Sequence, residues 1–196
     1  MCCGSWLGFD SEEASMNLRS VLRRSLGVQV AAVVVIGLGL PGAASASTAQ
    51  VAGSPNTCAL QTINTLNYVT AVDGGGRTTD VIRTNETQVR SWEKLTFVIT
   101  ADRNPTRYGI KTSGGFYLTA VGGGGRDTDV IHSNATQLQA WEKFNIVVLE
   151  GNVVALQTIT GNYLTAVGGG GRTSDVIHSN ATVIGTWERF FLTCGF

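Results

Sequence analysis

The chain has 196 residues, and its 14 lysines and arginines balance 14 aspartates and glutamates, so its formal net charge is zero. Proteins that bind nucleic acid or an anionic membrane surface need a basic face. The balanced charge therefore argues against both classes of partner.

The N-terminal part of the chain has the three regions of a secretory signal peptide. Three arginines precede the apolar stretch 30–40, and the small-residue run 43–46 follows it. A charged region, an apolar region and an Ala-Ser-Ala cleavage site are typical of an export signal. The apolar stretch is shorter than the about 20 residues that span a bilayer. We therefore expect cleavage near Ala46, a secreted (extracellular) protein and no stable membrane insertion.

The segments around this signal are assigned by composition. Residues 1–15 contain three acidic residues that suit no signal-peptide start, so we interpret them as an upstream extension from a start codon called too early. The signal peptide then covers 16–46, and 47–57 is a short N-terminal linker. The remaining residues 58–196 have the size of one domain.

Two cysteines remain in the exported chain, Cys58 near its start and Cys194 near its end. Two cysteines in a secreted protein usually pair, so we predict a disulfide that joins the first strand of the domain to the last. Two free buried thiols are the alternative. Neither interpretation leaves a cysteine cluster for a metal site.

The domain is built from three copies of one unit. The segment Tyr163–Arg172 has an identical copy at Tyr117–Arg126 and a near copy at Tyr68–Arg77. The three later tryptophans keep the same spacings as these tyrosines, so the length variation falls between repeats. A fixed period of this size indicates a repeat architecture. The repeats run over about 58–100, 107–149 and 153–196.

Each repeat is predicted to hold four short strands. In the third repeat we expect them at 154–158, 163–167, 175–179 and 187–192, with a loop at the glycines 168–171. Such a unit cannot bury a core alone, and closing three units into one barrel removes most free edges. We therefore predict an all-β fold, a β-trefoil with pseudo-threefold symmetry. A three-bladed propeller is the alternative architecture, but so few blades would leave its centre too open.

The core is predicted to consist of threefold-related sets. They are Leu60/Ile110/Leu156, Val69/Leu118/Leu164, Ile82/Ile131/Ile177, Trp92/Trp141/Trp187 and Leu95/Phe144/Phe190. If the tryptophans point inward, the glutamates that follow them point outward. We expect Glu93, Glu142 and Glu188 to pair with a neighbouring lysine or arginine at the surface.

The pattern Ala-Leu-Gln-Thr, then Gly-Asn-Tyr-Leu-Thr-Ala-Val with four glycines, then Trp-Glu-Arg-Phe resembles the repeat of the fascin-like β-trefoils. The resemblance covers Cys58 to Phe196. It implies actin cross-linking in multi-domain cytoskeletal members, and a sugar-binding or accessory module in secreted bacterial members. This chain departs from the actin-bundling pattern because it carries an export signal and only one trefoil. A Gln-x-Trp match to ricin-type lectins occurs once, at 139–141, and we interpret it as chance.

An arginine follows each glycine-rich segment, with an aspartate three residues later, and two repeats add a histidine after that. One hypothesis is a shallow site in which backbone amides and these side chains hydrogen-bond a sugar. The other is a structural loop that needs positive φ and is tied by internal ion pairs. The candidate ligand-binding residues are Arg77, Asp80, Arg126, Asp129, His132, Arg172, Asp175 and His178.

The sequence favours binding over catalysis. Threefold repetition gives equivalent, separated acids, whereas glycosidic cleavage needs two nearby acids in different environments. We expect no enzyme activity, no cofactor and no metal. The leading hypothesis is a monomeric, lectin-like module for a polysaccharide or cell-surface glycan with up to three equivalent sites. The alternatives are a fascin-type protein-interaction module and, after it, a protease inhibitor that uses the loop 101–107.

Overall fold

The computed structural model describes residues 56–103 and 105–196. The predicted upstream extension, signal peptide and cleavage site lie outside the described residues, as does most of the linker. None of the helices in the described residues could span a lipid bilayer.

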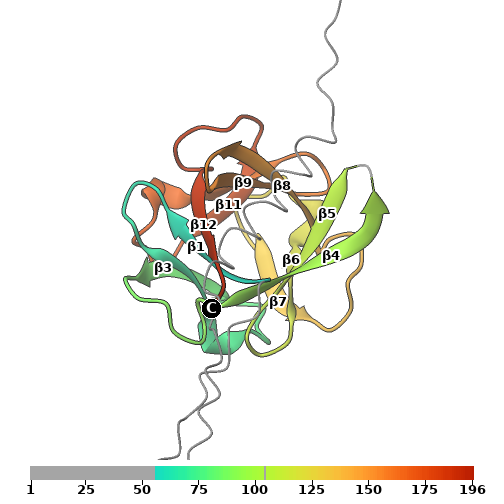
Figure 1. The fold of residues 1–196 in the computed structure, drawn as a ribbon, viewed down its shortest axis with the longest axis horizontal. Helices are drawn as coiled ribbons and strands as arrows, with labels where there is room; N and C mark the ends of the chain where they lie inside the picture. The colour runs from blue at the N-terminus through green and yellow to red at the C-terminus, as the bar shows by residue number, and fades with distance from the viewer. Residues whose placement is uncertain (1–55, 104) are drawn as a thin grey trace, which may run out of the picture.

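Six strands close into a barrel (Figure 1). They are β1 (Thr57–Thr62), β4 (Leu95–Arg103), β5 (Thr106–Lys111), β8 (Lys143–Glu150), β9 (Val153–Gln157) and β12 (Phe190–Cys194). All neighbours are antiparallel: β1 pairs with β4, β4 with β5, β5 with β8, β8 with β9 and β9 with β12. The ring closes because β12 also pairs with β1. Each of these strands therefore has a partner on both sides, which protects the sheet from edge-to-edge association.

Three hairpins, one from each repeat, are attached to this barrel. They are β2 (Tyr68–Ala71) with β3 (Ile82–Glu86), β6 (Tyr117–Ala120) with β7 (Ile131–Ala135), and β10 (Tyr163–Ala166) with β11 (Ile177–Ala181). Each hairpin joins the first strand of its own repeat through one register pair. A short 3-10 turn follows the first strand of each hairpin: η1 (Val72–Gly74), η2 (Val121–Gly123) and η3 (Val167–Gly169). The predicted β-trefoil with three four-stranded repeats is confirmed.

Strand positions differ from the sequence prediction in the second half of the repeat. β11 begins at Ile177 and β12 at Phe190, two or three residues later than expected. Asp175 has a φ of 48°, a left-handed conformation that a strand cannot contain. Trp187 and Glu188 lie in a turn before β12. The strands therefore start only after these turn residues.

Four of the five predicted core sets pack in one hydrophobic core. The sets led by Leu60, Val69 and Leu95 are buried in all three repeats, and in the fourth set Ile82 and Ile131 are buried while Ile177 packs against the core from a partly buried position.

The prediction for the tryptophans and the following glutamates is wrong. Trp92, Trp141 and Trp187 are 44%, 50% and 47% exposed. The glutamates are buried instead, with exposures of 2%, 6% and 8% for Glu93, Glu142 and Glu188. The Trp-Glu pair lies in a turn, so the inward and outward alternation of a strand does not apply to it. Hydrogen bonding to the turn, described below, draws the carboxylate inward.

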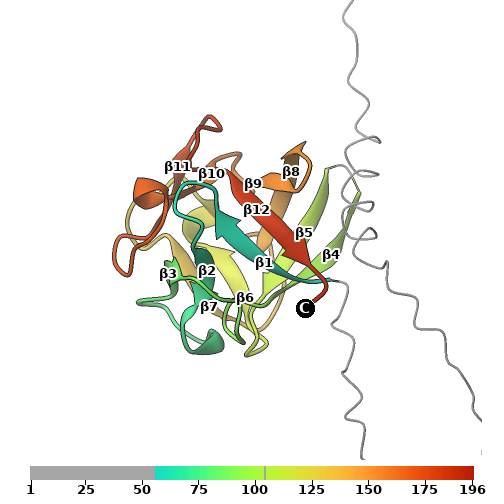
Figure 2. The same cartoon turned by 60° about the vertical axis from the view of Figure 1, so that its left-hand side comes forward.

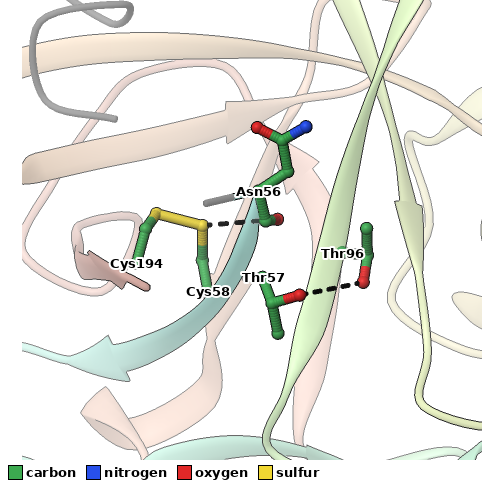
Figure 3. Close-up of a disulfide and its surroundings, with 5 residues drawn as sticks. All are labelled: Asn56, Thr57, Cys58, Thr96 and Cys194. Atoms are coloured by element: carbon green, nitrogen blue, oxygen red, sulfur yellow. Dashed lines mark hydrogen bonds between the residues drawn. A yellow bond between two sulfur atoms is a disulfide. The ribbon is translucent and has the colours of Figure 1, made fainter. Parts of the chain in front are cut away.

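The predicted disulfide between Cys58 and Cys194 is confirmed (Figure 3). The two cysteines are register partners on β1 and β12, which lie side by side in Figures 1 and 2. The amide of Gly195 donates to the Thr57 carbonyl over 2.9 Å, so the C-terminus lies against the start of β1. On its other side, Thr57 shares a 3.4 Å hydroxyl contact with Thr96 of β4.

Candidate functional site

The glycine loops, defined as 74–76, 122–125 and 168–171, are fixed by contacts with the next repeat. Gly75, Gly124 and Gly170 have φ of 104°, 108° and 107°, a region open to glycine alone. A Cβ atom at these positions would lie only 2.5, 2.4 and 2.7 Å from a threonine Oγ1, namely that of Thr112, Thr158 and Thr62. Glycine is thus required by both backbone conformation and space.

Backbone hydrogen bonds join each glycine loop to the third strand of the next repeat. The Gly76 amide donates to the Ser133 carbonyl over 2.7 Å, and the Ser133 amide donates to the Arg77 carbonyl over 2.8 Å. The same two bonds link Gly125 and Arg126 to Ser179, and Gly171 and Arg172 to Thr84. The amides of these last loop glycines, which the sequence hypothesis offered to a ligand, are therefore used to join the repeats.

The predicted arginines fold back onto their own loops. Each Nε donates over 3.2 Å to a carbonyl two residues later, that of Thr79, Thr128 or Ser174. Each guanidinium also reaches the aspartate of its repeat, with N–O distances of 3.6 Å for Arg77–Asp80, 3.7 Å for Arg126–Asp129 and 3.3 Å for Arg172–Asp175. The arginines and aspartates thus meet within each repeat as exposed ion pairs, which contribute little to stability.

Each aspartate is held from its other side by the residue three positions later. Nε2 of His132 and of His178 lies 2.7 Å from Oδ1 of Asp129 and of Asp175. Repeat 1 has Arg83 here, and its hydrogen bond to the carboxylate is the main cause that holds the pKa of Asp80 below its ordinary value. The predicted His, Asp and Arg groups therefore come together in three separate clusters.

The segments that follow the glycine loops line a shallow depression of ≈ 600 Å³. All three repeats contribute equivalent segments to it, namely 78–82, 127–131 and 173–177. The Val-Ile pair of each segment supplies apolar lining, and the three aspartates supply carboxylates. Within the described residues, no group of three or more histidine, cysteine, aspartate or glutamate side chains is arranged to hold a metal ion.

The Trp-Glu turns are the feature that sequence reasoning missed. Each glutamate carboxylate accepts a hydrogen bond from a threonine hydroxyl, over 2.8 Å from Thr70, 2.7 Å from Thr119 and 2.7 Å from Thr165. Its other oxygen accepts the amide three residues earlier, over 2.8 Å from Arg90, 2.9 Å from Gln139 and 2.7 Å from Gly185. The tryptophan carbonyl accepts the amide of Ala71, Ala120 or Ala166. The turn backbone is thus fixed, while the indole ring stays half exposed.

Two of the indole rings lie beside the glycine loop of their own repeat. A Cβ atom at Gly74 or Gly123 would be 3.6 or 3.5 Å from Cδ1 of Trp92 or Trp141. The absence of a side chain on the glycine leaves this edge of each ring uncrowded. The sequence contained a signal for the exposure of these rings. Polar or small residues precede the tryptophan of each repeat, in Arg-Ser-Trp, Gln-Ala-Trp and Gly-Thr-Trp.

The buried glutamates give a first testable prediction. Replacing Glu142 by alanine leaves the Thr119 hydroxyl and the Gln139 amide without their acceptor, and hydrogen bonds to charged groups contribute about 1.5–3 kcal/mol each. We expect Glu142→Ala to lower the free energy of unfolding by about 3 kcal/mol in urea titrations. Glu142→Gln keeps one acceptor for the amide and should cost clearly less. Equal stability of the alanine variant and the wild type would contradict this role.

Comparison with known proteins supports the fold class. No family model and no curated protein matches the sequence. Among solved structures, the designed threefold-symmetric protein ThreeFoil matches with a TM-score of 0.60 and 10% identity, over 70% of this chain and 98% of its own. SeviL bound to asialo-GM1 saccharide matches at 0.55 and 12%, over 72% and 98%. The BEL β-trefoil matches at 0.56 and 8%, over 70% and 92%. At these identities the likeness shows the fold alone, a β-trefoil.

Proposed function

We propose that this protein is an exported, non-enzymatic, lectin-like module that binds glycans at up to three sites, one at each exposed tryptophan. The observation that supports this best is the set of three indole rings, each about half exposed on a hydrogen-bonded turn. An isolated exposed tryptophan needs no explanation, but the same exposed ring in every repeat, on a fixed turn, suggests a use. A rigid aromatic ring offers an apolar surface at low entropic cost.

Sugar chemistry suits this arrangement. The C–H face of a pyranose can stack on an indole ring, while its hydroxyls need donors and acceptors nearby. The eight arginine, aspartate and histidine residues predicted from the sequence follow the same glycine loops, and their side chains are a quarter to a half exposed. They remain candidate hydrogen-bonding groups, although their mutual pairing limits what they can offer.

Two further observations agree with the proposal. SeviL, which shares the fold, is described with a bound glycan saccharide. The disulfide between Cys58 and Cys194 suits an oxidising, extracellular compartment. Three copies of a weak site on one domain would raise avidity for a polymer or a glycan-coated surface.

A glycan-array screen of the oxidised protein, followed by titration of the bound polysaccharide, tests the proposal. Stacking of a ring on an aromatic side chain contributes about 1–3 kcal/mol, judged from stacked bases. We expect the triple variant Trp92→Ala/Trp141→Ala/Trp187→Ala to lose about 5- to 150-fold in affinity at each site, since every site loses its ring.

Two control variants make this test specific. Val183 is 73% exposed and lies outside the Trp-Glu turns, so Val183→Ala should bind like the wild type. The triple variant Arg77→Ala/Arg126→Ala/Arg172→Ala tests the residues predicted from the sequence, and unchanged binding would restrict the sites to the tryptophans. A folded wild-type protein that binds no glycan would contradict the proposal and direct the search to protein partners, with actin co-sedimentation first.

A further inference from the structure

The three tryptophan sites share a backbone but differ in the side chains around the ring. The residue that pairs with the tyrosine on the neighbouring strand is Glu86 in repeat 1 and alanine in the other two, Ala135 and Ala181. The residue whose amide binds the buried glutamate is Arg90 in repeat 1, but Gln139 and Gly185 in repeats 2 and 3. Repeat 1 alone therefore places two opposite charges at its site.

These residues line a pocket in repeat 1. Glu86, Arg90, Ser91, Trp92 and Glu93 surround a volume of ≈ 250 Å³. Drug-sized ligands take about 300–1,000 Å³, so this pocket suits a single small ring. The half-exposed indole of Trp92 forms its apolar wall.

The two charged groups that distinguish this pocket are free to bind. Within the described part of the chain, neither the Glu86 carboxylate nor the Arg90 guanidinium makes a salt bridge or a side-chain hydrogen bond, and Glu86 acts on Arg83 only at longer range. The Glu93 carboxylate, in contrast, is 2% exposed and already accepts the Thr70 hydroxyl and the Arg90 amide. The pocket thus presents one accepting group, the Glu86 carboxylate, and one donating group, the Arg90 guanidinium, that no other side chain in the described residues engages.

We propose that repeat 1 is the principal glycan site and that it takes one uncharged pyranose ring with two adjacent hydroxyls. This inference rests on the glycan-binding function proposed above. The guanidinium donates hydrogen bonds and the carboxylate accepts them, and each hydroxyl of a diol can do both. The Glu86 carboxylate would repel the carboxylate of an acidic sugar, and the Arg90 guanidinium would repel the ammonium group of an amino sugar. Repeats 2 and 3, with neutral groups in place of both charges, serve as weaker stacking surfaces.

NMR titration of the ¹⁵N-labelled protein reports each site separately. Trp92, Trp141 and Trp187 are the tryptophans that remain after the predicted cleavage near Ala46. Their indole N–H signals can be assigned by single Trp→Phe variants. The probes are the methyl glycosides of glucose, galactose and mannose, with glucuronic acid and glucosamine as charged counterparts.

We expect at least one neutral methyl glycoside to shift the Trp92 signal at a concentration at least tenfold lower than it shifts Trp141 or Trp187, and tenfold lower than either charged sugar requires. The variant Glu86→Ala/Arg90→Gln copies the side chains of repeat 2 and should reduce the Trp92 response to that of Trp141. The reciprocal variant Ala135→Glu/Gln139→Arg should strengthen the Trp141 response. Unshifted signals of the untouched repeats show that each variant is folded.

The outcomes separate this inference from the proposed function. Equal responses at all three sites, or a Trp92 response confined to a charged sugar, would overturn the inference while glycan binding stands. A Trp92 response that survives in Glu86→Ala/Arg90→Gln would overturn the role of the two charges. No indole shift with any probe, together with a blank glycan array, would overturn both.

Discussion

Replacing Gly124 by alanine is expected to lower the free energy of unfolding by about 3–5 kcal/mol. Gly124 has a φ of 108°, in a region that costs other residues about 1–3 kcal/mol. Its new Cβ would also lie 2.4 Å from Oγ1 of Thr158, and overpacking of this kind costs about 1–3 kcal/mol. Urea unfolding followed by circular dichroism measures the change, which should appear in thermal melts as a Tm lower by about 10 °C.

Gly151 provides a matched control for this substitution. It also has a positive φ, 55°, but a Cβ there would meet nothing within 4 Å. We expect Gly151→Ala to lower the free energy of unfolding only through left-handed backbone strain, by about 1–2 kcal/mol. The less flexible unfolded chain of this variant offsets part of that loss. The difference between the two variants measures the contact with the next repeat together with the extra backbone cost of a φ of 108° at Gly124. Similar losses in both would mean that the glycine loops are not fixed by inter-repeat packing.

The fold could be predicted from the sequence because its signals are repeated three times. Each short strand alone is ambiguous, but the same alternation at the same place in three units leaves few architectures that bury a shared core. The disulfide followed from the same reasoning, since barrel closure brings Cys58 and Cys194 together on β1 and β12. Strand ends were less predictable: the left-handed Asp175 that delays β11 has no distinctive signal in the sequence.

The Trp-Glu turn shows why the candidate site was harder to predict. A rule based on hydrophobicity places tryptophan inside and glutamate outside. This rule fails when buried hydrogen-bond donors need a strong acceptor. In each turn, the buried glutamate carboxylate accepts hydrogen bonds from a threonine hydroxyl and from a backbone amide. Thr70 and Glu93, for example, form a hydrogen bond although they are 23 residues apart in the sequence. Such pairing cannot be read from periodicity alone.

The glycine loops had two interpretations in the sequence, a ligand site and a structural loop. The structure uses the Gly76, Gly125 and Gly171 amides to join neighbouring repeats, which agrees with the structural interpretation for these amides. Internal symmetry explains this: any residue at an interface between repeats must recur three times. Departures from symmetry are then the better guide to specificity, which is why Glu86 and Arg90 of repeat 1 carry the inference about the principal site.

Removal of the disulfide by the double variant Cys58→Ala/Cys194→Ala is expected to lower the free energy of unfolding by about 5 kcal/mol, with a Tm lower by about 10–20 °C. The bond spans 136 residues of sequence, almost the whole domain, so in the unfolded chain it removes much conformational entropy. The folded barrel should survive, because β1 and β12 keep five register pairs from Cys58↔Cys194 to Thr62↔Phe190. Urea unfolding measures the loss, and a near-native circular dichroism spectrum checks the fold.

Reduction of the wild type provides the control for this experiment. The wild type under a reducing agent should match Cys58→Ala/Cys194→Ala, because the exported chain has no other cysteine. A loss below about 1 kcal/mol would mean that β1 and β12 already meet in the unfolded chain. The tryptophan sites predict a second result: glycan affinity should persist in the reduced barrel, because the Trp-Glu turns are held by hydrogen bonds within their own repeats.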